Sequence, residues 1–322
     1  MTLSSDVSTT STALNNIKNA IIAKGQTPTG DITTYATAIG NIGGIKVPRE
    51  IKNGKYQMPT ENFTFSLPSD ATDIGNYVLY QMLYNCTGLT SVDLSSLTTV
   101  SGGCAFQFTF LSCTALTSVD LSSLITLSGS SAFHQTFKNC TGLTSVDLSS
   151  LTTVSGQSGL NSTFYGCTRL TSVSFPALTT ISGQKGFYQT FQSCTNLTSV
   201  SFPVLTTVSG QEGLYATFLY CTGLTSINFP ALTTIYGSSA FLYAFQNCTG
   251  LTSVSFPALT TSSFGSYKNQ FLNMMYNTGS TVTHTIHFPS NLESKISTLT
   301  GYPLFGGTSG YVTLAYDLPA TS

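Results

Sequence analysis

Residues 113 to 137 read CTALTSVDLSSLITLSGSSAFHQTF, and this frame recurs along the chain every 27 residues. The cysteine that opens the frame marks the register of each copy. It stands in seven equivalent positions: Cys86, Cys113, Cys140, Cys167, Cys194, Cys221 and Cys248. A period of this length, held over seven copies without an insertion, predicts a solenoid in which each copy stacks on the one before it.

Each copy starts with the pattern of a short parallel strand. A leucine such as Leu116 is followed after three residues by Val or Ile, and after two more by Leu or Phe. In this L-x-x-V-x-L pattern the apolar side chains point into the core and the intervening ones face solvent. A second apolar pair, such as Leu178 and Ile181, comes next, and a glycine such as Gly183 ends it. We expect that glycine to occupy a turn that needs positive φ.

A pair of large apolar side chains four residues apart follows the glycine, for example Phe106 with Phe110 and Phe133 with Phe137. Both side chains of such a pair lie on one face of a helix. The sequence therefore predicts a leucine-rich-repeat-like solenoid, in which short parallel strands are connected through helical or 3-10 turns.

One complete copy shows a family pattern. The run LTSVSFPALTTISGQKGF from Leu170 to Phe187, closed by Cys194, resembles the BspA-type leucine-rich repeats of bacterial surface proteins. The copies here are longer than those repeats by about one helical turn, which lies before the cysteine. The resemblance covers residues 64 to about 262, and it implies a binding or adhesive scaffold.

The last copy is modified. Met275 takes the place of the cysteine, and Ile286 to Pro289 repeats the earlier Val-Ser-Phe-Pro after an insertion. Ser290 with Glu293 is a capping-box pattern for a short helix, and Tyr311 to Leu318 alternates as a closing strand. The sequence therefore divides into a helical anchor at 1–43, a polar linker at 44–62, the solenoid at 63–275 and a capping region at 276–322.

The N-terminal residues have a different pattern. Ala13 to Ala23 and Ile32 to Ile39 each place apolar residues on one helical face, so we expect a small helical hairpin. Two short amphipathic helices bury too little apolar surface to be stable alone, and they should dock on a partner or self-associate. The expected anchoring residues are Leu14, Ile17, Ile21, Tyr35 and Ile39.

Residues 17 to 42, IKNAIIAKGQTPTGDITTYATAIGNI, are similar to segments near the start of tail-fibre and other virion proteins of tailed bacteriophages. The resemblance implies attachment to a phage particle. Met1 to Ala13 lacks the basic and then apolar order of a secretory signal, which fits a particle that leaves its host by lysis. The alternative reading is an ordinary helical cap that protects the first repeat.

Charge is scarce in this chain. It holds 11 Lys and Arg and 12 Asp and Glu, only 7% of the residues, with a formal net charge of −1. No basic field exists to attract nucleic acid or an anionic membrane. No run of 18 apolar residues is present, so we expect no membrane span. This composition suggests a virion or extracellular surface location.

The cysteine column has to be either reactive or structural. In a parallel stack the seven side chains would lie about 4.8 Å apart with parallel Cα–Cβ vectors, whereas a disulfide needs converging side chains. Metal binding is disfavoured because no C-x-x-C pair or Cys/His cluster is present. We therefore expect reduced, buried cysteines that pack as small apolar residues, with Cys104 outside the column as the accessible thiol.

No catalytic set or cofactor site is predicted. His284 and His287 are three apart in an expected strand and so lie on opposite faces, and His134 occupies a variable position. Two regular columns leave alternatives open. Asp93, Asp120 and Asp147 either hold a cation such as Ca²⁺ or form a solvated face that accepts hydrogen bonds. The threonine column that begins at Thr90 either is a hydroxyl lattice for ice or a crystalline polysaccharide, or simply stabilises parallel strands.

The segment between the glycine and the cysteine changes from copy to copy and is the best pointer to recognition. Aromatic rings beside amides and hydroxyls suit sugar faces and protein epitopes. The ligand-binding candidates are Phe108, His134, Gln135, Tyr165, Tyr188, Gln189, Tyr215, Tyr220 and Tyr243. The alternative is that these positions are unconstrained surface.

The sequence therefore predicts a non-enzymatic recognition or adhesion scaffold. We expect a phage tail-fibre-like or other virion protein that binds a host surface glycan or protein and joins its assembly through the N-terminal helices. A bacterial surface adhesin, or a filament subunit that contacts copies of itself as a homo-oligomer, is the alternative.

Overall fold

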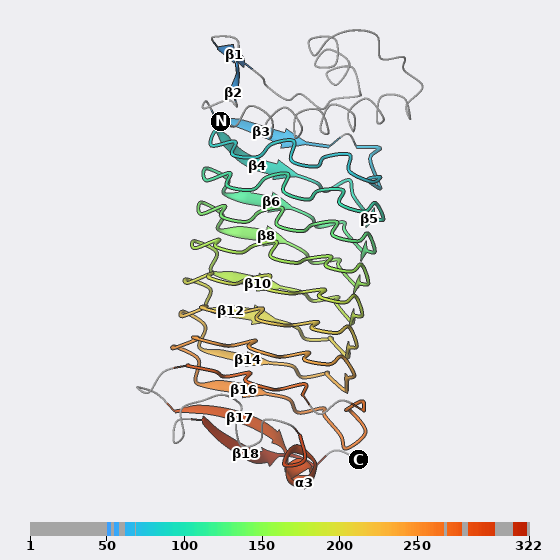
Figure 1. The fold of residues 1–322 in the computed structure, drawn as a ribbon, viewed down its shortest axis with the longest axis vertical. Coiled ribbons are helices and arrows are strands. Elements are labelled where there is room, and N and C mark those ends of the chain that lie inside the picture. The colour runs from blue at the N-terminus through green and yellow to red at the C-terminus, as the bar shows by residue number, and fades with distance from the viewer. Residues whose placement is uncertain are drawn as a thin grey trace, which may run out of the picture.

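The computed structural model describes residues 50–52, 55–57, 62–67, 69–266, 269–278, 283–299 and 312–320. Its main body is a straight parallel β-solenoid of about nine coils (Figure 1). This architecture confirms the predicted stack of short parallel strands. The predicted N-terminal hairpin, with its anchoring residues, lies outside the described residues.

One flank of the stack is a column of strands built from the L-x-x-V-x-L pattern. Each central Val or Ile is buried, and parallel pairing places it beside its equivalent one coil away, as Val119 lies beside Val146. The hydrogen bonds group the column into three sheets, β3-β4-β6-β8, β10-β12 and β14-β16-β17-β18. The strands are β3 (Phe63–Ser66), β4 (Leu89–Asp93), β6 (Ser118–Asp120), β8 (Ser145–Asp147), β10 (Ser172–Ser174), β12 (Ser199–Ser201), β14 (Ser226–Asn228), β16 (Ser253–Ser255), β17 (His284–Pro289) and β18 (Val312–Leu318).

A second flank is formed by the second apolar pair of each copy. Its strands are only two residues long, with a half-buried Thr followed by a buried Val, Leu or Ile. They form one six-stranded parallel sheet in the order β15-β13-β11-β9-β7-β5. The strands are β5 (Thr99–Val100), β7 (Thr126–Leu127), β9 (Thr153–Val154), β11 (Thr180–Ile181), β13 (Thr207–Val208) and β15 (Thr234–Ile235).

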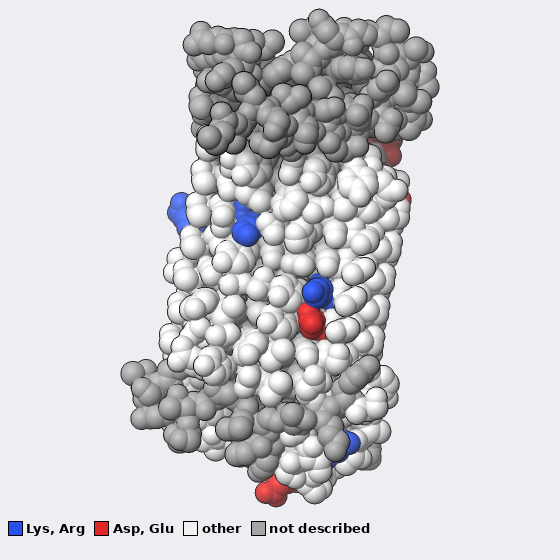
Figure 2. Space-filling view, viewed as in Figure 1, with Lys and Arg blue, Asp and Glu red and all other residues white. Residues whose placement is uncertain are grey.

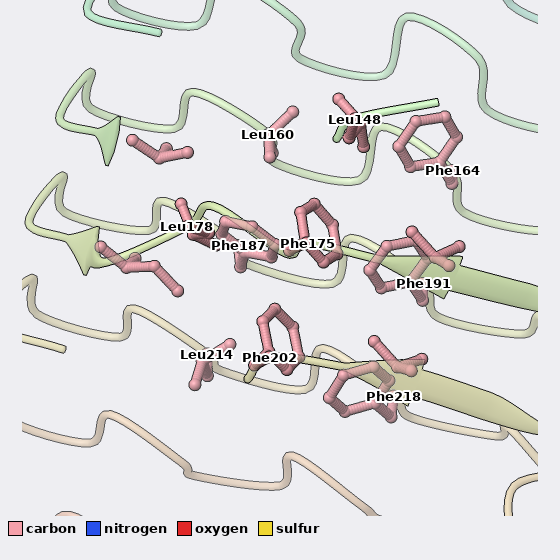
Figure 3. Close-up of a cluster of buried hydrophobic side chains, with 14 of the residues drawn as sticks. Leu148, Leu160, Phe164, Phe175, Leu178, Phe187, Phe191, Phe202, Leu214 and Phe218 are labelled. Atoms are coloured by element: carbon pink, nitrogen blue, oxygen red, sulfur yellow. The ribbon is translucent and has the colours of Figure 1, made fainter. Parts of the chain in front are cut away.

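Columns of like side chains fill the interior. The rings of Phe164, Phe191 and Phe218 stack almost parallel, with successive centroids 5.6 and 5.9 Å apart (Figure 3). A second column begins where phenylalanine replaces leucine in the later strands, and Phe175 stacks on Phe202 at 5.0 Å. These side chains are almost completely buried. Because phenylalanine buries more apolar area than most residues, each coil carries a large hydrophobic stabilisation.

The segment between the glycine and the cysteine is a turn ribbon, residues 103–113 in one coil and their equivalents in the others, and it is not helical. Its amide groups alternate between two partners. Phe108 donates to the carbonyl oxygen of His134 in the next coil at 3.1 Å, and Thr109 donates to that of Phe106 at 3.0 Å. The second bond closes a four-residue turn whose third residue, Phe108, has a φ of 58°. The prediction of helical or 3-10 turns is therefore wrong.

Coil spacing explains the turn ribbon. Parallel strands hold successive coils about 4.8 Å apart, whereas helices pack with their axes about 8–10 Å apart. A stack with strands on two flanks cannot widen on the third flank and stay straight. The ribbon keeps the strand spacing because every second amide bonds to the next coil. A four-residue turn also repeats every four residues, so it buries the phenylalanine pairs that predicted a helix.

The glycine column has a role different from the predicted one. Gly102, Gly129, Gly156, Gly183, Gly210 and Gly237 do not have the positive φ that we expected. They are needed because successive coils approach closely: a Cβ atom on Gly156 would collide with the carbonyl oxygen of Gly129. Left-handed backbone instead occurs in the turn ribbon, at three positions per coil such as Cys104, Phe108 and Ser112.

The two ends of the chain depart from the repeat. The predicted polar linker contains a short antiparallel pair, β1 (Glu50–Lys52) with β2 (Lys55–Gln57). At the other end, β17 pairs in register with β16 and so confirms a modified eighth copy, and β18 adds a parallel strand to β17, as the closing strand predicted. The prediction that Met275 takes the place of the cysteine is wrong: this coil is offset by 30 residues, Asn277 bonds to Asn247, and Thr278 therefore corresponds to Cys248. Between them lie η1 (Ser290–Leu292) and α3 (Glu293–Ile296). The predicted capping box does not form, since neither helix start has a side-chain cap.

Candidate recognition surface

The turn ribbon carries a row of aromatic side chains that contact one another from coil to coil. Tyr188 and Tyr215 stack with centroids 4.6 Å apart and planes 5° apart. The row continues edge to face from Tyr215 to Tyr243 at 5.8 Å and from Tyr243 to Tyr276 at 6.1 Å. Burial, followed by the neighbouring Tyr188, raises the pKa of Tyr215. Its phenol is therefore a neutral hydrogen-bonding group at any physiological pH.

The first coils carry a second part of this row. Tyr77 meets Tyr80 at 5.9 Å, Tyr80 meets Phe108 at 6.0 Å, and Phe108 meets His134 at 5.4 Å, all edge to face. Burial, helped by the Lys138 ammonium, lowers the pKa of His134. Its Nδ1 is buried and has no hydrogen-bond partner in the described part of the chain. His134 therefore acts as a neutral aromatic ring in this row.

Amide side chains stand beside the rings. Gln157 donates to Gln184, and Gln184 donates to Gln211, each across one coil with an Nε2 to Oε1 distance of 3.4 Å. All three are exposed. Gln135 and Gln189 are half-buried, and no side-chain hydrogen bond ties either amide to the rest of the described chain. The surface thus offers amide donors and acceptors at the spacing of the coils.

The few charges on the turn ribbon are matched to rings or to each other. The Lys138 ammonium lies 4.6 Å from the Tyr165 ring centroid, and that of Lys185 lies 5.3 Å from the Tyr188 centroid. Lys185 also forms an ion pair with Glu212 at 3.6 Å. Charged side chains are sparse over the whole face seen in Figure 2. The surface is therefore aromatic and polar but close to neutral.

The structure places all nine predicted candidates on the turn ribbon, although in different ways. Contacts link Tyr188, Tyr215 and Tyr243 in one group and Phe108 with His134 in another. Tyr165 lies apart from both groups, beneath Lys138. The others stand in neighbouring positions of the ribbon: Gln135, Gln189 and Tyr220, the last of which is 47% exposed.

Several residues of this surface were not among those predicted from the sequence. Tyr77 and Tyr80 belong to the coil of Cys86, and Tyr80 stands six residues before that cysteine as Tyr188 does before Cys194, so the 27-residue register could have placed them. Tyr276 follows an insertion and falls outside that register. The glutamine row was visible in the sequence, because each member directly follows a column glycine at the repeat spacing. The list of missed residues is Tyr77, Tyr80, Tyr276, Gln157, Gln184 and Gln211.

The aspartate column lies on a different flank. Asp93, Asp120 and Asp147 line a groove of about 650 Å³ over the strands β4, β6 and β8. Each carboxylate accepts a hydrogen bond from the backbone amide two residues later, as Asp120 does from Ser122 at 2.9 Å. This arrangement fits the solvated face rather than the cation site. In the part of the chain that the structure describes, no three His, Cys, Asp or Glu side chains gather as metal ligands.

The threonine columns are bonded within the stack. Thr117 donates to the carbonyl oxygen of Thr90 at 3.0 Å, and Thr144 donates to that of Thr117 at 3.0 Å. The second flank repeats this pattern, for example from Thr206 to Thr179 at 3.1 Å. These hydroxyl protons are used by the neighbouring coil. The columns therefore stabilise parallel strands, which was the simpler of the two alternatives.

The two remaining predictions concern thiols and histidines. All seven column cysteines are free and fully buried, and Cys104 is half-buried. His284 is buried, while His287 lies on the opposite face of β17 and pairs with Asp317 at 2.9 Å. The histidine faces are as predicted.

The helices of the described residues are also too short to cross a membrane.

The repeat region matches a known protein family. The BspA type Leucine rich repeat region matches residues 35–136 and 134–243, in six copies. The solved structure of a TLR13-ssRNA13 complex is similar at 11% identity with a TM-score of 0.21, over 79% of this chain and 53% of that one. The chain thus spans about half the length of that solved chain. No curated protein matches the sequence.

Proposed function

Because the chain belongs to the BspA-type leucine-rich repeat family, we propose that it is a non-enzymatic scaffold that presents the turn ribbon to a ligand on a host surface. Leucine-rich repeat proteins are generally recognition or adhesion scaffolds. The observation that carries the proposal is the contact row from Tyr188 through Tyr215 and Tyr243 to Tyr276, flanked by the exposed amides of Gln184 and Gln211. Tyrosines fixed by their neighbours lose little entropy when a ligand binds them.

The setting that we propose is a virion, with a host glycan or protein as ligand. Its support is the likeness of residues 17–42 to the start of tail-fibre proteins. In this proposal residues 1–43 attach the scaffold to the particle, and the solenoid displays the turn ribbon. A bacterial surface adhesin would use the same ribbon with a different attachment.

Cell binding tests the recognition surface. The labelled full-length chain is applied to a panel of bacterial cells, and bound protein is compared with the variant Tyr188→Ala/Tyr215→Ala. Tyr236→Ala is the matched control, because Tyr236 is 49% exposed and follows β15 on another flank. We expect the double variant to lose at least about tenfold in affinity, as hot-spot tyrosines do, while the control binds normally. Equal binding by all three proteins would refute the proposal.

Deletion tests the attachment. A chain that lacks residues 1–43 should still bind cells but should no longer join the particle or surface assembly. The melting temperature of the deleted chain separates this role from that of a protective cap. A cap would lower the melting temperature, whereas an anchor would leave it unchanged. Entry of the deleted chain into the assembly would contradict the anchoring role.

A further inference from the structure

Aromatic rings occur along the whole stack: the two contact groups and, between them, Tyr165 give at least one ring in every complete coil. The eight coils from Tyr77 to Tyr276 contribute, in order, the tyrosines of the first coil and then Phe108, His134, Tyr165, Tyr188, Tyr215, Tyr243 and Tyr276. Seven coil steps of about 4.8 Å make the row roughly 34 Å long. A ligand that contacts the whole row must therefore be extended and must lie along the stack.

The ring orientations show which atoms are available. Tyr188 and Tyr215 cover each other's faces, and the Lys185 ammonium lies over the Tyr188 ring. A sugar therefore cannot stack on both faces of these rings, and their edges and hydroxyls are the groups left for a ligand. The amides of Gln184 and Gln211 repeat at the same coil spacing. Recognition here depends on hydrogen bonds at a regular interval more than on ring stacking.

The charge pattern of the ribbon further restricts the chemical class of the ligand. Single-stranded nucleic acid needs aromatic platforms together with a basic groove, and anionic polysaccharides need a similar basic track. On this ribbon Lys185 is paired with Glu212, and Lys138 lies over a tyrosine ring. The described part of the ribbon has no continuous track of cations. The polymer that fits is uncharged.

We infer that the turn ribbon binds a linear, uncharged polysaccharide that runs along the stack with about one sugar residue per coil. This inference rests on the proposed function and names the ligand class for the same surface. The coil spacing of about 4.8 Å is close to the length that one pyranose adds to an extended chain. Over the five coils from Tyr165 to Tyr276 each successive sugar then meets a phenol, and the amides of Gln157, Gln184 and Gln211 repeat in the first three of these coils. The rigid ribbon holds these groups in place before the ligand arrives, which reduces the entropic cost of binding.

The test uses the full-length chain and immobilised linear oligomers of glucose, mannose, galactose and N-acetylglucosamine, each from two to eight residues long. Hyaluronan oligomers of the same lengths provide a charged comparison, and short branched glycans provide a compact one. We expect affinity for at least one neutral linear series to rise with every added residue. We also expect a loss of at least about tenfold for Tyr188→Ala/Tyr215→Ala on the longest oligomer, and no loss for Tyr236→Ala.

The results of this test distinguish an error in the ligand class from an error in the recognition surface. Binding to a short branched glycan, or to hyaluronan, that depends on Tyr188 and Tyr215 would overturn the linear neutral ligand and leave the recognition surface intact. Binding to cells that depends on the ribbon, without binding to any neutral oligomer, would also overturn the linear neutral ligand and leave the recognition surface intact. It would favour a protein ligand. Oligomer binding that the double variant does not change would overturn both this inference and the proposed function.

Discussion

The Sγ atom of Cys140 lies 3.2 Å from the carbonyl oxygen of Phe110, one coil earlier, and donates a hydrogen bond to it. Thr136, four residues before the cysteine, donates in the same way to the carbonyl oxygen of Phe106 at 2.8 Å. The two side chains occupy equivalent places in successive turns of the ribbon. The column cysteine is thus an inward donor that links two coils, as well as a small apolar residue.

Thiol reactivity follows from this placement. In the folded chain, iodoacetamide should modify Cys104 and leave the seven column cysteines unmodified, because their sulfur atoms are buried. Mass spectrometry of the native and the denatured protein counts the labels. The variant Cys104→Ser should take up no label until it unfolds. Rapid labelling of several cysteines in the native chain would contradict the buried column.

Stability should fall in alkaline solution. Burial raises the pKa of Cys140 and of Cys194 to about 12, whereas an unfolded thiol titrates near 8.5. The folded state then holds its thiol protons more tightly than the unfolded state does. This contribution is fully present below about pH 8.5 and is lost as the pH rises toward 12, at up to about 1.4 kcal/mol per pH unit for each thiol.

Thermal unfolding between pH 7 and 11 measures this loss. We expect the free energy of unfolding to decrease above pH 8.5, and the decrease to be shallower in Cys140→Ser, which lacks one titrating thiol but keeps a donor. Comparison of the two proteins cancels the tyrosines and lysines that also titrate. Identical slopes would show that Cys140 is not buried as described.

A pair of alanine to glycine changes separates the turn ribbon from a helix. Ala216 and Ala132 are both buried in the ribbon, but only Ala216 has a left-handed backbone, with a φ of 49°. Ala216→Gly should stabilise the chain by about 1 kcal/mol because it relieves that conformation. Ala132→Gly should destabilise it by about 1 kcal/mol. Chemical denaturation gives both values, and destabilisation by both changes would support a helical segment.

A methyl group inside the glycine column should be far more damaging than one at the glycine where the column begins. At Gly156 the added Cβ would collide with the backbone of Gly129, so Gly156→Ala should cost about 3 kcal/mol. At Gly75, which begins the column 27 residues before Gly102, the nearest atom of the described residues to an added Cβ is Cγ2 of Val78, at an ordinary 3.7 Å. Gly75→Ala should therefore change stability by no more than about 0.5 kcal/mol. Equal effects in urea denaturation would mean that the coils do not approach closely.

The register of the fold could be predicted from the sequence, because Cys86 to Cys248 hold one period and a parallel stack is its simplest solution. The conformation of the turn ribbon could not be predicted in this way. A spacing of four between Phe106 and Phe110 fits a helical turn and a four-residue turn equally well, and only the spacing between coils decides. Asn85 and Asn139, each directly before a cysteine, were the available sign of left-handed backbone.

The candidate surface was predicted in position but not in geometry. Variation between copies pointed to the turn ribbon, where Tyr188 and Tyr215 are indeed neighbours. Periodicity does not determine side-chain orientation. The sequence therefore could not show that the two rings cover each other's faces. For the same reason the sequence did not show that Lys185 is matched to both Tyr188 and Glu212.

Site-specific photo-crosslinking tests most directly whether the ligand lies on the turn ribbon. A photoreactive amino acid replaces Tyr215 on the ribbon, Asp120 in the strand groove, or Tyr236 beyond β15, and each protein is irradiated while bound to the cells that it recognises. The account predicts a cross-link to the cell surface ligand from position 215 and none from positions 120 and 236. Cross-links from position 120 or 236, with none from 215, would contradict it.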